Sequence, residues 1–330
     1  MDSIFTLQNF YQVTQSIYNY MVTGQFERQL KLARQGNAQA QNWVGYQYET
    51  GQEGVAKDEV QAVAWYRKAA AQGYALGQNN LGCMYENGRG GLPQDEAQAA
   101  AWYRKSAEQG YAGAQYTLGL MYENSLCGLP QDGVQAVAWY RKAAEQGHAF
   151  AQGNLGSMYI IGKGGLPQDE VQATVWYCKA AEQGDTVGQN NLGVMYENGR
   201  GGLPQDEVQA VVWYRKAAEQ GEEAAQYKLG VMYETGRGGL LKDEAQALVW
   251  YRKAAEQGFA EAKQAIERLS ATQPQPTTQV PTVSSTAVLQ QPTPQQRVAI
   301  TTPSQTPSSS KALEKDAGKT DKRSRAGIRF

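Results

Sequence analysis

The sequence contains a single histidine and three cysteines, which leaves little material for the commonest metal and nucleophile sites. Cys83, Cys127 and Cys178 lie far apart along the chain, so neither a Cys-x-x-Cys metal spacing nor a disulfide ladder is present. No base or metal ligand can be paired with His148, and we expect its side chain to be exposed. No catalytic residue, metal site or cofactor is predicted, and the chain is not expected to be an enzyme.

Long apolar runs and a strong net charge are also missing. No stretch approaches the roughly 18 apolar residues of a membrane span, so no span is predicted. The formal net charge of −1 gives no bulk attraction to nucleic acid. Residues 1–20 lack the basic and apolar regions of an export signal. We expect a cytoplasmic protein, with secretion by a non-classical route as the alternative.

A Trp-Tyr pair returns at a constant interval of 37 residues, for example from 65 to 102. Two series of glycines keep the same interval, one containing Gly36 and the other Gly45. A fixed period of this length is typical of stacked supersecondary units. The pairs are Trp65-Tyr66, Trp102-Tyr103, Trp139-Tyr140, Trp176-Tyr177, Trp213-Tyr214 and Trp250-Tyr251.

Each unit is predicted to contain two antiparallel helices. In the second unit, small and apolar residues between 75 and 85 recur at spacings of three and four, which predicts a first helix. Gly88 is expected to end this helix. After a Gly- and Pro-containing loop, Asp95 and Gln98 have the spacing of a reciprocal capping box. In the equivalent second helix of the first unit, Trp65 and Tyr66 are expected to be buried.

The repeated pattern resembles a known family. It reads Ala-x-Ala-Gln-x-x-x-Leu-Gly-x-Met-Tyr-x-x-Gly, a Gly-rich loop, then Asp-x-x-x-Ala-x-x-Trp-Tyr-x-Lys-Ala-Ala-x-Gln-Gly. This is similar to the Sel-1-like repeat, a relative of the tetratricopeptide repeat, over residues 37–258 as six units. The resemblance implies an all-α, right-handed α-solenoid of helix-turn-helix repeats whose first helices line a concave face. It also implies a non-catalytic scaffold for protein–protein interaction.

The flanking segments differ from the repeats. Residues 1–36 are predicted to form N-terminal capping helices and residues 259–270 a C-terminal capping helix. Residues 271–330 are rich in Pro, Gln, Thr and Ser, and are predicted to be a disordered tail. Its basic end, residues 322–330, is either solvated charge, a targeting or docking motif, or a ligand for the acidic array of the same chain.

Residues that occupy the same position in successive repeats form a column. Two adjacent columns of the first helices point away from the predicted core and are rich in asparagine. Asparagine offers a donor and an acceptor to an extended peptide, and tyrosine adds apolar area with a polar edge. The alternative is ordinary solvated polar surface. The residues predicted to bind a protein or peptide partner are Asn79, Asn80, Tyr116, Asn154, Asn190, Asn191, Tyr227 and Lys228.

A column of glutamates, which includes Glu86, Glu197 and Glu234, could attract a basic partner. An arginine follows each of these three by three residues, so local ion pairs within a unit are the expected alternative.

Two other functions remain as alternatives. One is a secreted bacterial effector or virulence-associated adaptor, because the family is frequent in host-associated bacteria. The other is a β-lactam- or peptidoglycan-related enzyme, as in cysteine-rich relatives, although the paired cysteines of those relatives are absent here. The sequence specifies neither the partner nor the oligomeric state.

Overall fold

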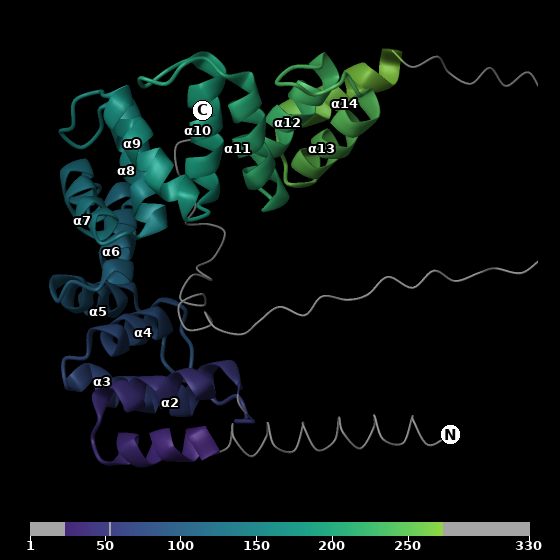
Figure 1. Cartoon of the computed structure of the whole chain (residues 1–330). Coiled ribbons are helices and arrows are strands. Elements are labelled where there is room, and N and C mark those ends of the chain that lie inside the picture. The colour runs from purple at the N-terminus through teal and green to yellow at the C-terminus, as the bar shows by residue number, and fades with distance from the viewer. Residues whose placement is uncertain (1–23, 53, 273–330) are drawn as a thin grey trace, which may run out of the picture.

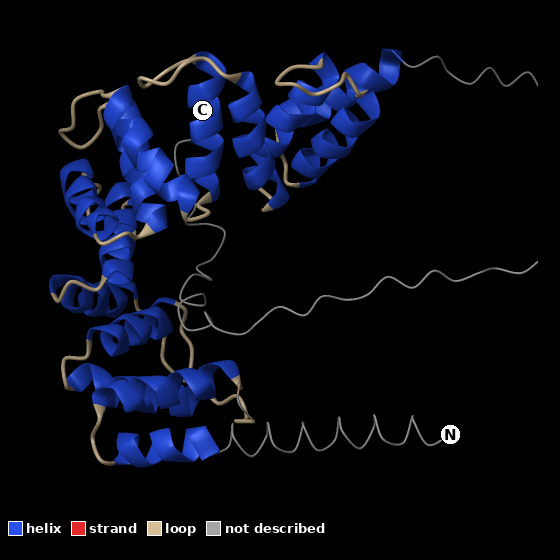
Figure 2. Ribbon diagram, in the orientation of Figure 1, coloured by secondary structure: helices blue, strands red, loops and turns tan. Residues whose placement is uncertain are grey.

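Helices are the only regular elements in the part of the chain that the computed structural model describes, residues 24–52 and 54–272 (Figure 2). Residues 24–34 are helical and precede the first labelled helix. The labelled helices are α2 (Ala38–Thr50), α3 (Glu59–Ala71), α4 (Ala75–Glu86), α5 (Glu96–Glu108), α6 (Ala112–Asn124), α7 (Gly133–Glu145), α8 (Ala149–Ile161), α9 (Glu170–Glu182), α10 (Thr186–Asn198), α11 (Glu207–Glu219), α12 (Glu223–Thr235), α13 (Glu244–Glu256) and α14 (Ala260–Thr272). The predicted all-α solenoid is confirmed.

Each helix packs against the next along the chain, and the stack forms an open arc (Figure 1). The even-numbered helices α2 to α12 are the first helices of the pairs, and the odd-numbered ones are the second helices. Direct contacts also join α2 to α4 and α8 to α10, which are first helices of neighbouring units. At these two junctions the first helices therefore lie closer together than the second helices do. We call the side of the arc formed by the first helices the inner face, and the second helices the outer helices.

The ends of the second helices follow the sequence signals, with one correction. Asp95 caps α5, because its Oδ1 accepts a hydrogen bond from the backbone N–H of Gln98 at 2.9 Å. A reciprocal bond from the Gln98 side chain was expected, but the N–H of Asp95 instead donates to the carbonyl of Tyr85 at 2.9 Å. This bond ties the loop to α4, and the equivalent bond is made by the capping aspartate of every repeat.

The tyrosine of each Trp-Tyr pair lies at the centre of the core. Five of these tyrosines are 0% exposed and Tyr103 is 3% exposed. Their rings lie on a glycine in the first helix of the same unit. A Cβ atom at Gly119 would lie only 2.6 Å from ring carbons of Tyr140, so no larger residue fits without displacing the ring. This close approach explains the glycine series that contains Gly45.

The tryptophans are less buried than expected. Trp65 is 8% exposed, but the other five are only half-buried. Each indole ring is covered by the lysine three residues later, with the ammonium nitrogen 3.8–4.4 Å from the ring centroid. The prediction of a fully buried tryptophan column is therefore wrong for units two to six, where the rings form a boundary layer under lysine.

The two ends of the array are closed by additional helices. The helix at 24–34 buries Leu30 and Ala33 against α2, and α14 buries Ala262 and Leu269 against the core around Tyr251. Residues 1–23 of the predicted N-terminal cap lie outside the described residues. The same is true of the predicted tail beyond Thr272, including its basic end.

Candidate functional site

The residues predicted to bind a partner all lie on first helices, α4, α6, α8, α10 and α12. Five of them are half-buried, so part of each side chain is accessible: Asn79, Asn80, Tyr116, Tyr227 and Lys228. The other three, Asn154, Asn190 and Asn191, are only 8%, 1% and 1% exposed. The expectation that these three lie away from the core on an accessible surface is wrong, while a role in binding remains a prediction for all eight.

The buried asparagines lie on α8 and α10, two first helices that contact each other directly. A Cβ atom at Gly153 on α8 would lie 2.6 Å from Oδ2 of Asp185, the residue that caps α10. A Cβ atom at Gly188 would lie 2.7 Å from the Cβ of Ala180 on α9. The first of these contacts joins α8 to α10, whereas the second joins α10 to α9 and recurs at Gly77 in the second unit. Sequence spacing alone could not show that these asparagines would become enclosed.

The asparagines of α10 keep hydrogen-bonding capacity that the described residues do not use. Nδ2 of Asn190 donates to Oδ1 of Asn191 at 3.3 Å. Within residues 24–52 and 54–272, Oδ1 of Asn190 and Nδ2 of Asn191 have no partner. A buried polar atom without a partner costs about 1–3 kcal/mol. One acceptor and one donor are therefore left side by side, which is the combination that a peptide backbone provides in return.

Aromatic side chains join first helices across unit boundaries. Tyr116 stacks on His148, with ring centroids 4.7 Å apart, and Phe150 lies 6.0 Å from Tyr116. Tyr227, which occupies the same column as Tyr116, lies 5.2 Å from Phe259. The predicted exposure of His148 is wrong, because the ring is half-buried and its Nδ1 accepts from the N–H of Ala151. Burial lowers the pKa of His148 to about 4.

The glutamate column is engaged inside the array. Glu123 accepts a hydrogen bond from the hydroxyl of Tyr140 at 2.7 Å and pairs with Nζ of Lys163 at 3.2 Å. Four of the other second-helix tyrosines donate to the equivalent glutamate at 2.6–2.7 Å. These carboxylates are therefore structural groups, and the structure does not present them as an open attraction for a basic partner.

The expected ion pairs within a unit are wrong. Arg89 pairs with Glu49 at 2.7 Å and with Glu59 at 2.8 Å, and both glutamates belong to the preceding unit. Arg237 likewise pairs back to the preceding unit, with Glu207 at 2.6 Å. The guanidinium of Arg89 is the main reason that the pKa of Glu59 is lowered to about 2. These pairs join one unit to the next, which a reading of helical spacing within one unit could not find.

A glutamine column was missed as a polar network. Gln115 is 4% exposed, donates its Nε2 to the carbonyl of Ala107 at 3.1 Å, and accepts from Gln146 at 2.7 Å. The same arrangement recurs in all six units, so each of these glutamines connects three helices. The signal was present in the sequence, since a glutamine stands within every predicted packing stripe.

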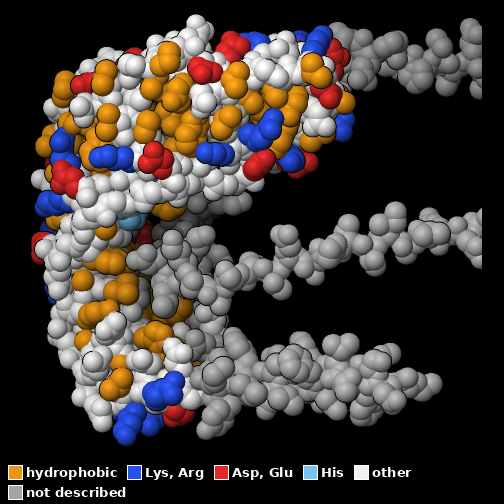
Figure 3. Space-filling view, viewed as in Figure 1, with side chains coloured by type: hydrophobic (Ala, Val, Ile, Leu, Met, Phe, Trp, Pro, Cys, Tyr) orange, Lys and Arg blue, Asp and Glu red, His pale blue; other side chains and the backbone are white. Residues whose placement is uncertain are grey.

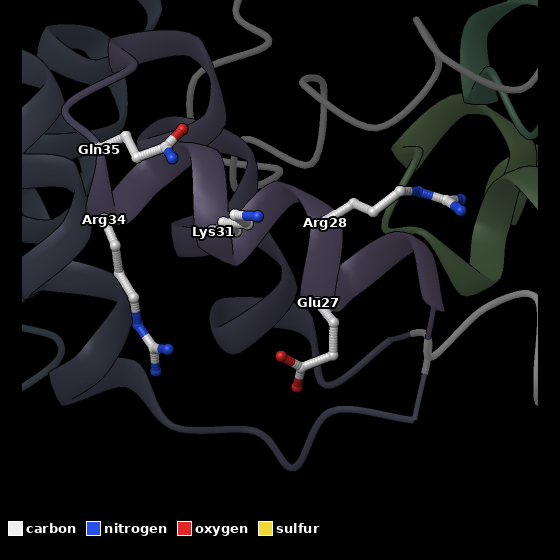
Figure 4. Close-up of a pocket in the computed structure, with 5 residues that line it drawn as sticks. All are labelled: Glu27, Arg28, Lys31, Arg34 and Gln35. Carbon is white, nitrogen blue, oxygen red and sulfur yellow. The ribbon is translucent and has the colours of Figure 1, made fainter.

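One shallow hollow lies on the N-terminal helix of the described residues. It is lined by Glu27, Arg28, Lys31, Arg34 and Gln35, all from the helix at 24–34 and the residue that follows it. Figure 4 shows these side chains diverging instead of converging on one point. Within residues 24–52 and 54–272 no group of His, Cys, Asp and Glu side chains could hold a metal ion. No helix of that part is long and apolar enough to cross a membrane.

The surface of the array mixes apolar and charged side chains. In Figure 3, hydrophobic side chains alternate with lysine, arginine and acidic residues over the part of the arc formed by the last helices. The exposed valines of the second helices contribute to this surface, and they are Val60, Val134, Val171, Val175, Val208, Val212 and Val249. We use these outer helices below as a control surface.

Comparison with known proteins agrees with the fold. A family model described as Sel1 repeat matches residues 38–74, 75–111, 112–148, 149–185, 186–222 and 223–259. No curated protein matches the chain. One similar solved structure is that of a protective antigen present in uropathogenic Escherichia coli strains, which displays an SLR (Sel-1-like repeat) fold. It is 40% identical to this chain, with a TM-score of 0.63. That match covers 74% of this chain and 51% of the antigen, so the chain spans about half the length of that relative.

A second similar structure is a Sel1 repeat protein from Oxalobacter formigenes. It is 33% identical with a TM-score of 0.61, and the match covers 75% of this chain and 95% of that protein. Six consecutive matches to one repeat model, together with these two structures, establish the family. The chain belongs to the Sel1 repeat family, whose members generally act as scaffolds for protein–protein interaction.

Proposed function

We propose that the inner face binds an extended segment or a helix of a partner protein, and that the array itself is non-catalytic. The observation that carries this proposal is the repeated presentation of half-buried amide and aromatic side chains on successive first helices. Asn79 and Asn80 occupy α4, Tyr116 occupies α6, and Tyr227 and Lys228 occupy α12. Such side chains combine adaptable hydrogen bonding with apolar contact area, as protein-binding surfaces commonly do.

The unused acceptor of Asn190 and donor of Asn191 support the same proposal, because they lie between these positions on α10. The Lys228 ammonium is held 3.2 Å from Glu197 and therefore does not repel a basic ligand as a lone charge would. A single inner surface thus runs over neighbouring units, which is how solenoid proteins generally engage long ligands.

Site-specific photo-cross-linking in cells tests the proposal. A benzophenone amino acid is placed at Asn79 or Tyr116 on the inner face, and at exposed Gln98 or Gln209 on the outer helices α5 and α11. We expect covalent protein adducts from the two inner positions and few or none from the outer ones. Adducts that form only at Gln98 and Gln209 would move the binding surface to the other side of the arc.

A matched variant tests the contribution of the side chains. Replacement of Asn79, Asn80 and Tyr227 by alanine should reduce the yield of the adduct from Tyr116, because all three are half-buried and contribute accessible surface. The control is Gln98→Ala with Gln209→Ala, which removes exposed side chains from the outer helices. Equal yields in both variants would mean that the inner side chains do not contribute to binding.

A further inference from the structure

Negative charge is concentrated where α10 and α12 begin. Asp185 caps α10, Glu222 occupies the same place before α12, and Glu223 follows it. In the first four units this capping column holds Asn37, Tyr74, Tyr111 and His148. Asp185 and Glu222 are 4% and 7% exposed, and attraction between such sheltered carboxylates and a cation is stronger than on open surface. Only the fifth and sixth units therefore have an acidic residue in this column, which is aromatic again at Phe259.

Repeat geometry places Asn190 beside Glu222. In the equivalent pairs of the other units, Tyr116 stacks on His148, Gly153 approaches Asp185 and Tyr227 lies against Phe259. Each of these pairs is separated by 32 residues, as are positions 190 and 222. The unused Oδ1 of Asn190 thus adds a neutral acceptor to the carboxylates, and the unused Nδ2 of Asn191 lies next to it. We call Asp185, Asn190, Glu222 and Glu223 the acceptor cluster.

An acceptor cluster of this composition suits a guanidinium group. Arginine carries five N–H donors in a planar fork and accepts nothing, so it can contact carboxylates and an amide oxygen together. The free donor of Asn191 suits a backbone carbonyl of the same ligand. The ligand indicated is therefore a peptide segment that contains arginine, and an isolated cation would leave the Asn191 donor unused.

We propose that residues 322–330 of the same chain, the basic segment, bind at the acceptor cluster. This segment contains Lys322, Arg323, Arg325 and Arg329, followed by Phe330. Residues 271–330 hold eight Lys or Arg and three acids, whereas the whole chain has a net charge of −1, so the remaining residues are net acidic. The arginines pair with the carboxylates, and Phe330 contacts the aromatic residues Tyr116 and Phe150 on the neighbouring helices.

Chain length permits this contact. About 50 residues separate Thr272 from Lys322, and at about 3.3 Å per residue they span at most roughly 160 Å. Helix packing distances of about 10 Å place α10 roughly 40 Å from α14 along the stack. The linking segment is therefore several times longer than the path it must cover.

Binding of the basic segment would place it on the surface that the proposed partner uses, so this inference rests on the proposed function. The segment then acts as a competitor within the same chain and raises the partner concentration needed for binding. Competition of this kind also disfavours partners that cannot displace an arginine-rich peptide from the acceptor cluster.

The test places a benzophenone amino acid at Phe330 of the otherwise unaltered full chain. After irradiation at low protein concentration, monomeric product is digested and the cross-linked sites are mapped by mass spectrometry. We expect intramolecular cross-links to α6, α8, α10 or α12. Cross-links to the second helices only, to a second copy of the chain only, or to no part of the array would each overturn the proposal.

Variants that remove charge provide a second test of the proposal. Asp185→Asn with Glu222→Gln and Glu223→Gln should lower the yield of these cross-links about tenfold, the change expected for loss of one charge-assisted contact. Asn also caps α2, so Asp185→Asn retains the cap of α10. The control is Glu108→Gln with Glu145→Gln and Glu219→Gln, exposed residues of the second helices with the same change in charge. An equal decrease in both variants would show that the cross-link yield depends only on net charge, and would overturn the acceptor cluster as the binding site.

The two proposals fail in different experiments. The probe at Phe330 reports where the basic segment lies, whereas probes at Asn79 and Tyr116 report whether another protein touches the inner face. Partner adducts without contact from Phe330 would overturn only the inference about the basic segment. Contact from Phe330 without partner adducts at the inner positions would instead overturn the proposed function.

Discussion

Each buried tyrosine hydroxyl needs an acceptor, and five of six take a glutamate of the preceding helix. The fourth unit is different, because Ile160 replaces the glutamate and the Tyr177 hydroxyl lies 3.1 Å from Oγ of Ser157. Burial, followed by the charge of the nearby glutamate, raises the pKa of Tyr140 well above its usual value, so the phenol remains a donor. Every unit therefore keeps a hydrogen-bond partner for its buried tyrosine hydroxyl, either a glutamate or the Ser157 hydroxyl.

Tyr140→Phe should destabilise the array by about 1–3 kcal/mol, because Glu123 is 6% exposed and loses a hydrogen bond. Tyr177→Phe should cost less, since the Ser157 hydroxyl also lies 3.2 Å from the carbonyl of Gly153 and keeps a partner. Urea unfolding of the two variants measures the difference. A larger loss for Tyr177→Phe would show that the glutamate is not the more demanding acceptor.

Tryptophan and tyrosine of one pair should differ in cost. Sequence reasoning places Trp139 in the core and predicts a loss of about 3–5 kcal/mol for Trp139→Ala. The indole is half-buried under Lys142, at 4.0 Å, and we now expect about 1–2 kcal/mol. Tyr140→Ala should cost about 3–5 kcal/mol, because Tyr140 is 0% exposed. Thermal or urea unfolding that ranks Trp139→Ala as the worse variant would contradict this placement.

His148 should make stability depend on mildly acidic pH. Burial lowers its pKa from 6.5 to about 4, so between these values the unfolded chain binds a proton that the folded chain does not. The contribution is complete above pH 6.5 and is lost as the pH falls toward 4. His148→Asn retains the cap, as Asn37 does for α2, and should remove this part of the pH dependence. Urea midpoints at pH 7 and 4.5 compare the two proteins, and equal changes would contradict the prediction.

At this scale the sequence is a good guide to which residues are equivalent and a poor guide to how exposed they are. The 37-residue period correctly aligned the tyrosine of each Trp-Tyr pair and the glycine on which its ring lies. It could not distinguish half-buried Asn79 from buried Asn190, because exposure depends on how closely neighbouring helices approach, as Gly153 does to Asp185. Exposure is a property of packing between units, which periodicity does not contain.

Among the elements, the loop of the third unit has residues other than glycine in a left-handed conformation. Ser125 and Cys127 have φ values of 56° and 53°, and both positions hold glycine in the second, fourth, fifth and sixth units. At the matching Gly90, a Cβ atom would lie 2.5 Å from Cγ2 of Val63. Beneath Cys127 the place of that valine is taken by Ala100, on α5 of the second unit, and Cys127 is buried in the same cluster. A larger loop residue is therefore matched by a smaller residue on the helix beneath it.

This pairing predicts a non-additive mutant cycle. Ala100→Val alone should crowd Cys127, and Cys127→Gly alone should leave space beside Ala100. The double variant recreates the combination of Val63 with Gly90, and it should be more stable than the sum of the single changes by about 1–2 kcal/mol. Urea unfolding of the four proteins measures the coupling. Additive changes would show that the two positions do not share one space.

Boundaries of the helices were predictable because they rest on local chemistry. Each capping aspartate acts within three residues of itself, as Asp95 does with the N–H of Gln98. The other bond of Asp95 crosses to Tyr85, and Arg89 reaches Glu49 and Glu59 of the preceding unit. The predictions made from local spacing were wrong where a group instead contacts an element distant in the sequence.

For the whole molecule, stability follows from the junctions between neighbouring units. The second and third units are joined without the ion pairs found elsewhere, because Leu126 replaces the arginine of the column that contains Arg89. Among the described residues neither Glu86 nor Glu96 forms an ion pair. The array should therefore open most readily at this junction.

Hydrogen exchange tests this weak point. Amides of residues 124–133 should exchange faster than those of the equivalent residues 198–207, and Leu126→Arg should slow them by supplying a cation to Glu86 and Glu96. Exchange followed by mass spectrometry provides both comparisons in one experiment. Equal protection of the two segments would indicate that the missing ion pairs do not weaken the junction.

The bond from one glutamine across three helices is the same in every unit, and so is the glycine on which each tyrosine rests. A gene that gains or loses a multiple of 37 codons would consequently still encode an unbroken hydrophobic interior. The length of the array can then change by whole repeats during evolution, while each repeat remains free to vary the few side chains that contact a ligand.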